Sequence, residues 1–277
     1  MNARIRSVEA ARDAMLRRLL SDQEHASIVY PGKMPSEPVK KAFVRNRLLA
    51  GLSVPDLAAV GRYLEPVALK RRAILQEPKR TVEFVHFIEW GVVSVRIVAA
   101  GSMLETTLVG YRGAIGVPYL LGGHIPTSQF VAISPAYALR IRQDHLRDLI
   151  GERPGLREHL LRYVEAVALH SAQAGLCGVR HSLQQRLASW LCIACDAFGD
   201  DCLPVTHDYF ADVLGLRRAS VTETLTRFEQ HGLIKKSRGL LRVRDRKRLE
   251  LEACSCYALI TDAYTAAEAH ASLEQRP

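Results

Sequence analysis

Residues 206–229 read T-H-D-Y-F-A-D-V-L-G-L-R-R-A-S-V-T-E-T-L-T-R-F-E, and this stretch decides the fold of the C-terminal part of the chain. A short amphipathic helix is expected before Gly215, where glycine tolerates the positive φ of a sharp turn. A second helix follows, because Val221, Leu225 and Phe228 recur at helical spacing. The pattern predicts a helix-turn-helix, which places its second helix in the major groove of DNA.

The opposite face of the second helix is polar and basic. By the same spacing it carries Arg217, Arg218, Ser220, Thr222, Thr224 and Arg227. Side chains of these types hydrogen-bond base edges and phosphates. Spacing alone leaves one alternative open, an ordinary helical hairpin with a solvated basic face.

The charge of the chain is concentrated on this segment. The 277 residues suggest two domains, and the net charge is +9. Residues 206–250 hold eleven Lys or Arg against six Asp or Glu, which accounts for more than half of that net charge. A basic patch at this place favours DNA as the polyanionic partner.

Membrane and secretory classes find no support in the sequence. No run approaches the roughly 18 apolar residues that span a bilayer, and the N-terminus lacks the apolar core of a signal peptide. We therefore expect a cytoplasmic protein with no membrane partner, whose six cysteines are reduced.

Four segments are expected along the chain, and together they predict an α+β fold. Residues 1–45 form an N-terminal extension with a polar helix over 7–25. Residues 46–150 begin with one or two short helices over 46–63, with Ser53 as a candidate cap, and the period changes to two over 64–141. The predicted strands are 82–88, 92–98, 103–109, 129–134 and 136–141. Several short strands with turns between them indicate a β-roll or jelly roll.

Residues 151–181 return to helical spacing. A heptad-like seam is formed by Leu156, Leu160, Tyr163, Val167, His170 and Ala174. This predicts a dimerisation helix, since a DNA reader gains from pairing two half-sites. The alternative is a helix that packs on its own β-domain.

Residues 182–277 are expected to form a winged helix-turn-helix domain. A helix over 182–198 precedes the motif, and Gly232 is a candidate cap at its end. Residues 233–243 read as a hairpin with Lys235, Lys236 and Arg238, which would form a basic wing beside the second helix.

This order of elements, together with V-T-H-D-Y-F-A-D-V-L-G-L-R-R-A-S-V-T from Val205, resembles the Crp/Fnr family of bacterial transcription regulators. N-R-L-L-A-G-L from Asn46, G-V-P-Y-L-L-G-G from Gly116 and C-S-C-Y from Cys254 resemble an α-proteobacterial branch of it. The resemblance covers residues 46–257. It implies a non-enzymatic regulator that acts as a homodimer on palindromic promoter sites, with double-stranded DNA and RNA polymerase as partners.

The resemblance also implies DNA contacts. Arg218 matches the arginine that reads a guanine, and Ser220 matches a residue facing the phosphate backbone. The full expected set is Thr206, Arg217, Arg218, Ser220, Thr222, Glu223, Arg227, Lys235, Lys236 and Arg238. Two positions depart from the family pattern, because Ala219 replaces a common glutamate and Glu223 a common arginine. The family's usual half-site is therefore not assigned.

The sensor domain lacks the charges that a cyclic nucleotide needs. Family members that bind one use a glycine-glutamate loop and an arginine, whereas residues 113–139 contain no Asp, Glu, Lys or Arg. We expect no cofactor and a sensor domain that does not take cyclic nucleotide. An effector pocket, for an apolar or neutral molecule, would involve Arg112, Gly113, Gly116, Thr127 and Ser128.

Metal chemistry is not predicted. No cysteine precedes Cys177, which excludes the family's iron–sulfur cluster. Cys192 and Cys195 lie in a predicted helix, where cysteine behaves as a small apolar residue. Cys202, Cys254 and Cys256 complete no second C-x-x-C at ribbon spacing, so zinc or a redox pair is the less favoured alternative.

Two rival functions remain open at this point. One is an architectural DNA-binding protein without an effector. The other is an enzyme built on the β-domain, which the charge-free stretch disfavours because catalysis needs converging titratable groups.

Overall fold

The computed structural model describes residues 44–99, 102–121 and 126–273. Almost all of the expected N-terminal extension, including the polar helix over 7–25, lies outside these residues. The elements below belong to one compact unit, Pro38–Pro277.

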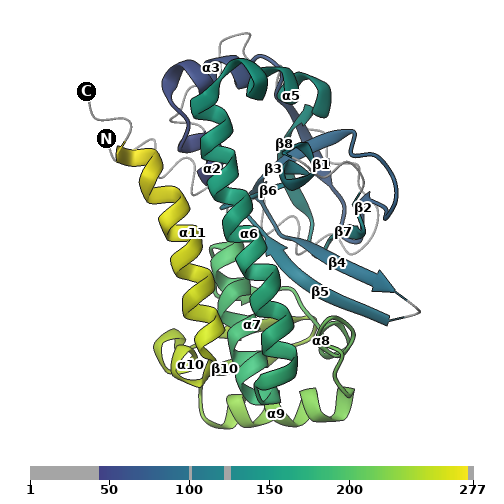
Figure 1. Ribbon diagram of the computed structural model, residues 1–277. Helices are drawn as coiled ribbons and strands as arrows, with labels where there is room; N and C mark the ends of the chain where they lie inside the picture. Colours follow the sequence, from purple (N-terminus) through teal and green to yellow (C-terminus); the bar gives the residue numbers. More distant parts are fainter. Residues whose placement is uncertain (1–43, 100–101, 122–125, 274–277) are drawn as a thin grey trace, which may run out of the picture. The chain divides into compact units, whose positions relative to one another are not determined.

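Two antiparallel four-stranded sheets form the β-roll (Figure 1). In sheet order, the first contains β1 (Glu65–Leu69), β8 (Ala136–Arg142), β3 (Phe84–Trp90) and β6 (Ala114–Ile115). The second contains β2 (Ile74–Gln76), β7 (Ser128–Ala132), β4 (Val93–Ala99) and β5 (Ser102–Val109). The predicted strands are confirmed, whereas β1 and β2 were not individually predicted.

Short helices close the ends of the β-roll. They are α2 (Arg47–Ala50), α3 (Val54–Gly61), α4 (Val117–Leu120) and α5 (Gln143–Glu152). Ser53 caps α3 as expected, since its hydroxyl accepts from the Asp56 N–H at 3.2 Å. Asn46 is fully buried; its side-chain oxygen caps α2, and its amide donates to the carbonyls of Ile88 and Gly113.

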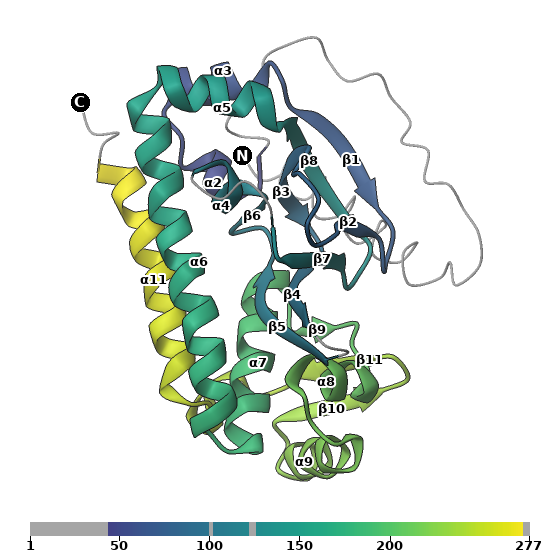
Figure 2. The ribbon, with the colours of Figure 1, turned by 45° about the vertical axis from the view of Figure 1, so that its right-hand side comes forward.

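The long helix α6 (Pro154–Arg180) packs against the β-roll on one side and against α11 (Ser255–Leu273) on another (Figure 2). Helix α11 was not predicted, because its weak amphipathic pattern gives little sequence signal. Tyr264 of α11 contacts the rings of Tyr163 and His170 on α6. Helix α11 thus covers part of the buried face of α6.

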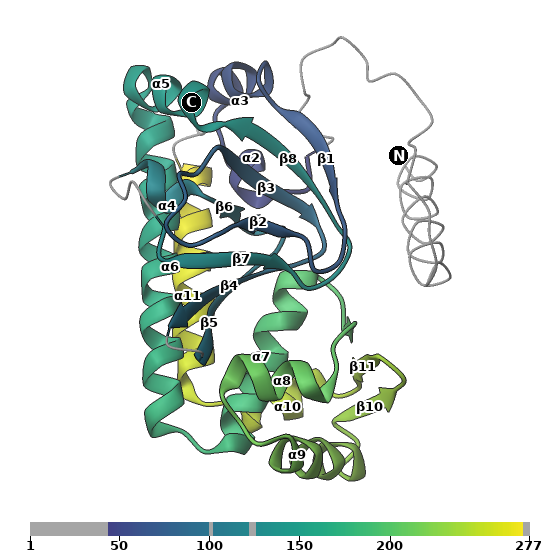
Figure 3. The same ribbon diagram turned by 90° about the vertical axis from the view of Figure 1, so that its right-hand side faces the viewer.

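The winged domain follows α6 (Figure 3). It contains α7 (Leu183–Phe198), β9 (Cys202–Leu203), α8 (His207–Leu214), α9 (Arg218–Gln230), β10 (Ile234–Ser237), β11 (Leu240–Val243) and α10 (Arg246–Glu252). A capping box between Ser182 and Gln185 starts α7. The sheet order is β10-β11-β9, so the predicted hairpin gains an additional strand, β9, from the loop before α8.

Strand β5 contacts this winged domain directly. The buried carboxylate of Glu105 accepts hydrogen bonds from Ser94, from the Trp190 indole at 2.6 Å and from the Tyr209 hydroxyl. Gly110 lies so close to α7 that a Cβ there would be 1.9 Å from the carbonyl oxygen of Ala197. The β-roll and the first helix of the helix-turn-helix therefore share a packed polar contact.

Candidate nucleic-acid interface

The turn between α8 and α9 has the geometry that the sequence predicts. Thr206 caps α8, because its hydroxyl accepts from the Tyr209 N–H at 3.3 Å. Gly215 ends α8 with φ of 61°, in the left-handed region that glycine adopts without steric cost. Nothing lies within 4 Å of the position that a Cβ would take at Gly215, so its backbone conformation is what favours glycine there.

One face of α9 is buried in the domain core. Val221 and Leu225 are fully buried, and Phe228 is nearly so, as predicted. Thr224 was expected on the opposite, DNA-facing side, and this was wrong. Its side chain is 6% exposed, and its hydroxyl donates to the Ser220 carbonyl at 2.9 Å. Thr224 lies three residues after Val221 and four before Phe228, so helical spacing puts it at the edge of the apolar stripe.

The outer face of α9 presents exposed arginines near its N-terminal end. Arg217 and Arg218 are exposed, and the Arg218 side chain keeps 71% of its accessible surface. Arg218 pairs with Asp208 at 2.9 Å, and Arg227 pairs with Glu223 at 3.4 Å. Exposed ion pairs of this kind contribute little stability, so these guanidinium groups can exchange a carboxylate for a phosphate or a base edge.

Ser220 and Thr222 are half-buried rather than freely exposed. The Thr222 hydroxyl lies 3.2 Å from Nδ1 of His207, on the first helical turn of α8. Burial lowers the pKa of His207, and the charges of Lys236 and Arg218 lower it further. The His207–Thr222 contact links α8 to α9, and it was not predicted because it joins two helices.

The wing presents a second set of cations. Lys235 and Arg238 are exposed, and Arg242 lies opposite Lys235 in the β10–β11 register. Arg242 was missed, although strand alternation indicates that it shares a face with Lys235. Lys236 differs, because its ammonium lies 3.2 Å from a Glu229 carboxylate oxygen and 2.9 Å from the Thr226 hydroxyl. Lys236 fastens the wing to α9.

Residues 185–252 match the family of Crp-like helix-turn-helix domains. The chain carries a Crp-like DNA-binding domain. This domain includes α8, the turn at Gly215, α9 and the wing, so the exposed arginines described above lie at the start of the second helix of its helix-turn-helix. A search of curated proteins found no match.

Solved structures show the same fold over most of the chain. FixK2 from Bradyrhizobium japonicum has a TM-score of 0.60 at 16% identity, covering 69% of this chain and 98% of its own. CLP from Xanthomonas campestris, a c-di-GMP responsive global regulator, has a TM-score of 0.58 at 12% identity, covering 70% and 100%. The Crp-family regulator TTHB099 from Thermus thermophilus has a TM-score of 0.54 at 19% identity, covering 68% and 96%. The chain therefore has the fold of Crp/Fnr regulators.

Two of the five predicted effector-pocket residues line one cavity. Arg112 and Gly113 line a cavity of about 40 Å³ between the β-roll and helices α6, α7 and α11, and Gly116, Thr127 and Ser128 do not line it. Arg112 donates to Glu268 of α11 at 2.7 Å. Its guanidinium is thus engaged by a carboxylate of this chain.

The residues of the predicted dimer seam lie largely inside the chain. Leu156, Leu160 and Tyr163 are each 1% exposed and His170 is 4% exposed, whereas Val167 and Ala174 are half-buried. The Tyr163 hydroxyl donates to the Ala114 carbonyl at 2.9 Å. These side chains therefore pack α6 on its own β-domain, which was the alternative to a dimer seam. The exposed apolar positions of α6 lie on another face.

Within the described residues, no helix combines the length and the apolar character needed to cross a membrane.

Proposed function

We propose that this chain is a homodimeric transcription regulator that binds DNA in a sequence-specific way, with a sensor domain that does not take cyclic nucleotide. The observation that carries the proposal is the exposed N-terminal end of α9, with Arg217 and Arg218, beside a wing that presents Lys235, Arg238 and Arg242. The Crp-like domain and the fold of known regulators support it over an enzyme built on the β-roll.

Specificity is assigned to Arg218, and affinity to the cations around it. A bidentate arginine–guanine pair contributes about 1–3 kcal/mol of discrimination. The wing cations reach phosphates, whose neutralisation releases counterions and makes binding depend on salt. Lys235 and Arg242 suit this role better than Lys236, since Lys236 is bound to Glu229.

Selection of binding sites from a random DNA library tests the assignment of Arg218. The wild-type protein should enrich a two-fold symmetric sequence. Arg218→Ala should bind that sequence about 5- to 150-fold more weakly and relax one position in each half-site. The matched control is Arg147→Ala, an exposed arginine on α5, which should bind as the wild type does. Equal weakening on every sequence would show that Arg218 contacts only phosphate.

A salt titration separates the wing from the reading helix. Lys235→Ala should weaken binding to all sequences alike and reduce the slope of log K against log salt by about 1. An unchanged slope would remove the wing from the interface.

Dimerisation is assigned to a stripe on α6 that stays exposed in the single chain. It consists of Leu161, Ala168, Ala172, Leu176 and Val179. Leu176 is 47% exposed and Val179 is 83% exposed, and a row of exposed apolar side chains along one helix face is the kind of surface that a partner covers. The spacings of three and four residues fit helix pairing along the length of α6, and the two alanines allow close approach.

Analytical ultracentrifugation tests this face. The wild type should sediment as a dimer, and a Leu176→Glu, Val179→Glu double variant as a monomer with unchanged circular dichroism. Leu251→Glu is the matched control, because Leu251 on α10 is 85% exposed and lies outside the stripe. A double variant that remains dimeric contradicts this interface without affecting the assignment of Arg218.

The absence of cyclic nucleotide binding is argued from charge. The stretch 113–139 supplies no charged side chain, and Arg112 is paired with Glu268. A phosphate there would have to displace that carboxylate. Calorimetric titration with cAMP and with cGMP should give no saturable heat, and saturable binding of either nucleotide would refute this part of the proposal.

An architectural role is the second candidate, favoured by the basic charge of the segment 206–250. Genome-wide occupancy distinguishes the two, because a regulator occupies discrete palindromic sites and an architectural protein gives diffuse coverage. We place the domain boundaries at 46–150, 151–181 and 182–277 as part of the same proposal, with RNA polymerase as the expected protein partner.

A further inference from the structure

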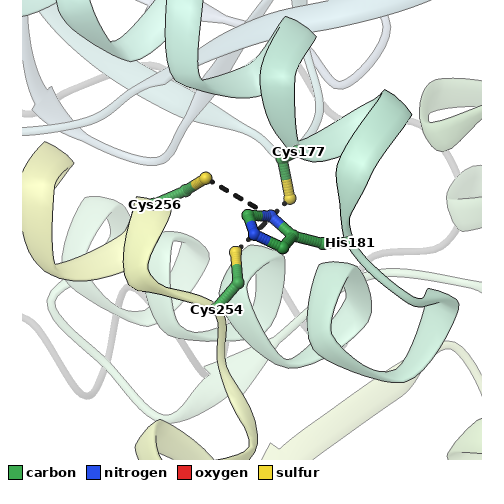
Figure 4. A group of neighbouring side chains, drawn as sticks. All are labelled: Cys177, His181, Cys254 and Cys256. Atoms are coloured by element: carbon green, nitrogen blue, oxygen red, sulfur yellow. Dashed lines mark hydrogen bonds between the residues drawn. The ribbon is translucent and has the colours of Figure 1, made fainter.

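Four side chains with metal-ligating atoms converge where α6 ends and α11 begins: Cys177, His181, Cys254 and Cys256 (Figure 4). Cys177 lies in the last turn of α6, and His181 directly follows that helix. Cys254 directly precedes α11, and Cys256 lies in its first turn. Folding therefore joins an i, i+4 pair and a C-x-C pair that are far apart in the chain.

The distances fit a tetrahedral ion. All four ligating atoms lie within 4.8 Å of one another. Sγ of Cys177 is 3.5 Å from Sγ of Cys254, and Sγ of Cys256 is 3.5 Å from Nδ1 of His181. A zinc ion with Zn–S bonds of about 2.3 Å and Zn–N bonds of about 2.0–2.1 Å places tetrahedral sulfurs ~3.8 Å apart, and sulfur and nitrogen ~3.6 Å apart. The two measured pairs are within a few tenths of an ångström of these values.

The surroundings support the ligands. Ser189 of α7 is buried, and its hydroxyl accepts from the Cys254 N–H at 3.0 Å while lying 3.1 Å from the Cys254 sulfur. With Cys254 as a metal-bound thiolate, this hydroxyl would donate to the sulfur, the kind of outer contact that orients metal ligands. Three thiolates and a divalent ion leave one negative charge, and the positive charge of Arg186 acts on Cys177.

The donor set selects the metal. Thiolate and imidazole ligands in tetrahedral geometry favour zinc over magnesium or calcium, which prefer oxygen. A disulfide between Cys177 and Cys254 is the competing interpretation. It would use two of the four groups and leave the convergence of His181 and Cys256 unexplained.

We propose that Cys177, His181, Cys254 and Cys256 bind one zinc ion as a structural site. The ion fastens the C-terminal end of α6 to the start of α11. Because His181 stands at the junction of α6 and α7, the ion also holds the connection between the long helix and the Crp-like domain. The site does not depend on the proposed function, since it concerns only the folding of this chain.

Elemental analysis and native mass spectrometry of the full-length protein, purified with a reductant, test the site. The wild type should retain about one zinc per chain, with four protein ligands and no open position. Cys254→Ser and Cys256→Ser should lose it. Cys202→Ser is the matched control, because Cys202 is half-buried in β9 outside the cluster, and it should retain zinc as the wild type does.

Two further measurements keep the proposal testable where a ligand variant fails to fold. Ser189→Ala leaves all four ligands in place and should weaken zinc affinity about 10- to 100-fold. A chelator should lower the Tm of the wild type, added Zn²⁺ should restore it, and Cys202→Ser should respond in the same way.

Three results would overturn the proposal. The first is a wild-type protein that neither contains zinc nor takes up Zn²⁺ after reduction. The second is Cys254→Ser retaining as much zinc as Cys202→Ser. The third is a Cys177–Cys254 disulfide, found by peptide mapping, in metal-free protein whose Tm does not respond to Zn²⁺.

Discussion

The contact between Tyr209 and Glu105 provides a quantitative test of how the β-roll holds the Crp-like domain. Tyr209 lies on α8, and its hydroxyl donates to the buried carboxylate of Glu105 on β5. Tyr209→Phe removes that hydroxyl and keeps the ring, whose centroid lies 5.8 Å from that of Trp190. The perturbation is therefore confined to one hydrogen bond.

Burial raises the pKa of Glu105, whereas the hydrogen bonds from Ser94, Tyr209 and Trp190 and the charge of Arg96 favour its ionised form. With an ionised acceptor, the expected cost is that of a hydrogen bond to a charged group. A hydrogen bond to a charged group contributes about 1.5–3 kcal/mol, against about 0.5–1.5 kcal/mol for a neutral pair. Ser94 and Trp190 still donate to Glu105 in the variant, so the carboxylate keeps two partners. We expect Tyr209→Phe to lower the free energy of unfolding by about 1.5–3 kcal/mol, and by about 1 kcal/mol less in a Glu105→Gln background.

Urea denaturation followed by tryptophan fluorescence measures this cost, because Trp190 donates to the same carboxylate, that of Glu105. Tyr63→Phe is the control, since Tyr63 is 42% exposed. A Tyr209→Phe variant within about 0.5 kcal/mol of the wild type would refute the reasoning. An equal cost with and without Glu105→Gln would show that the hydroxyl acts elsewhere.

The remaining predictions concern the interior of the protein. Burial lowers the pKa of His86 and of His170 to about 4, from about 6.5 when unfolded, so each should contribute stability that is lost as pH falls through this range. Between pH 7.5 and 5 the unfolding free energy should drop by about 2 kcal/mol for each histidine, and urea midpoints that do not change would contradict this. Gly110→Ala should lower the free energy of unfolding by about 1–3 kcal/mol or more, because its Cβ would lie 1.9 Å from a backbone oxygen of α7. Gly151→Ala, with nothing within 4 Å of its Cβ, should be neutral or stabilising, and thermal melts of the two variants check both expectations. Asn46→Asp keeps the cap of α2 but removes two amide hydrogen bonds, so it should lower the unfolding free energy by about 1–3 kcal/mol, and an unchanged urea midpoint would count against those bonds.

Local signals in the sequence were sufficient for the elements of the DNA-binding region. The turn at Gly215 and the spacing of Val221, Leu225 and Phe228 depend on backbone geometry within a few residues, and the structure confirms them. Thr224 shows the limit of this reasoning. A side chain at the edge of an apolar stripe is buried if the surface packed against the helix is wide enough to cover it. The periodicity of the sequence does not give that width.

Long-range contacts explain what could not be predicted. Lys236, one of the expected phosphate-binding cations, pairs with Glu229, and Arg112, which directly precedes the charge-free stretch 113–139, pairs with Glu268. Both partners are specified by tertiary packing. Cys177 and His181 stand four residues apart in the sequence but were not predicted as a ligand pair, and Cys254 and Cys256 come close to them only because α11 begins where α6 ends.

By itself, the sequence determined the main strands of the β-roll, the long helix, and the helix-turn-helix with its exposed arginines, because caps, turns and periodicity act over short distances. Only the tertiary structure decided which face of α6 is covered by the chain itself. Leu156, Leu160 and Tyr163 would be buried either at a dimer interface or in the core of a single chain. A heptad pattern indicates that one helix face is buried, but it does not indicate whether the chain itself or a partner covers that face. The β-roll and α11 cover that face, and the stripe with Leu176 and Val179 stays exposed in the single chain.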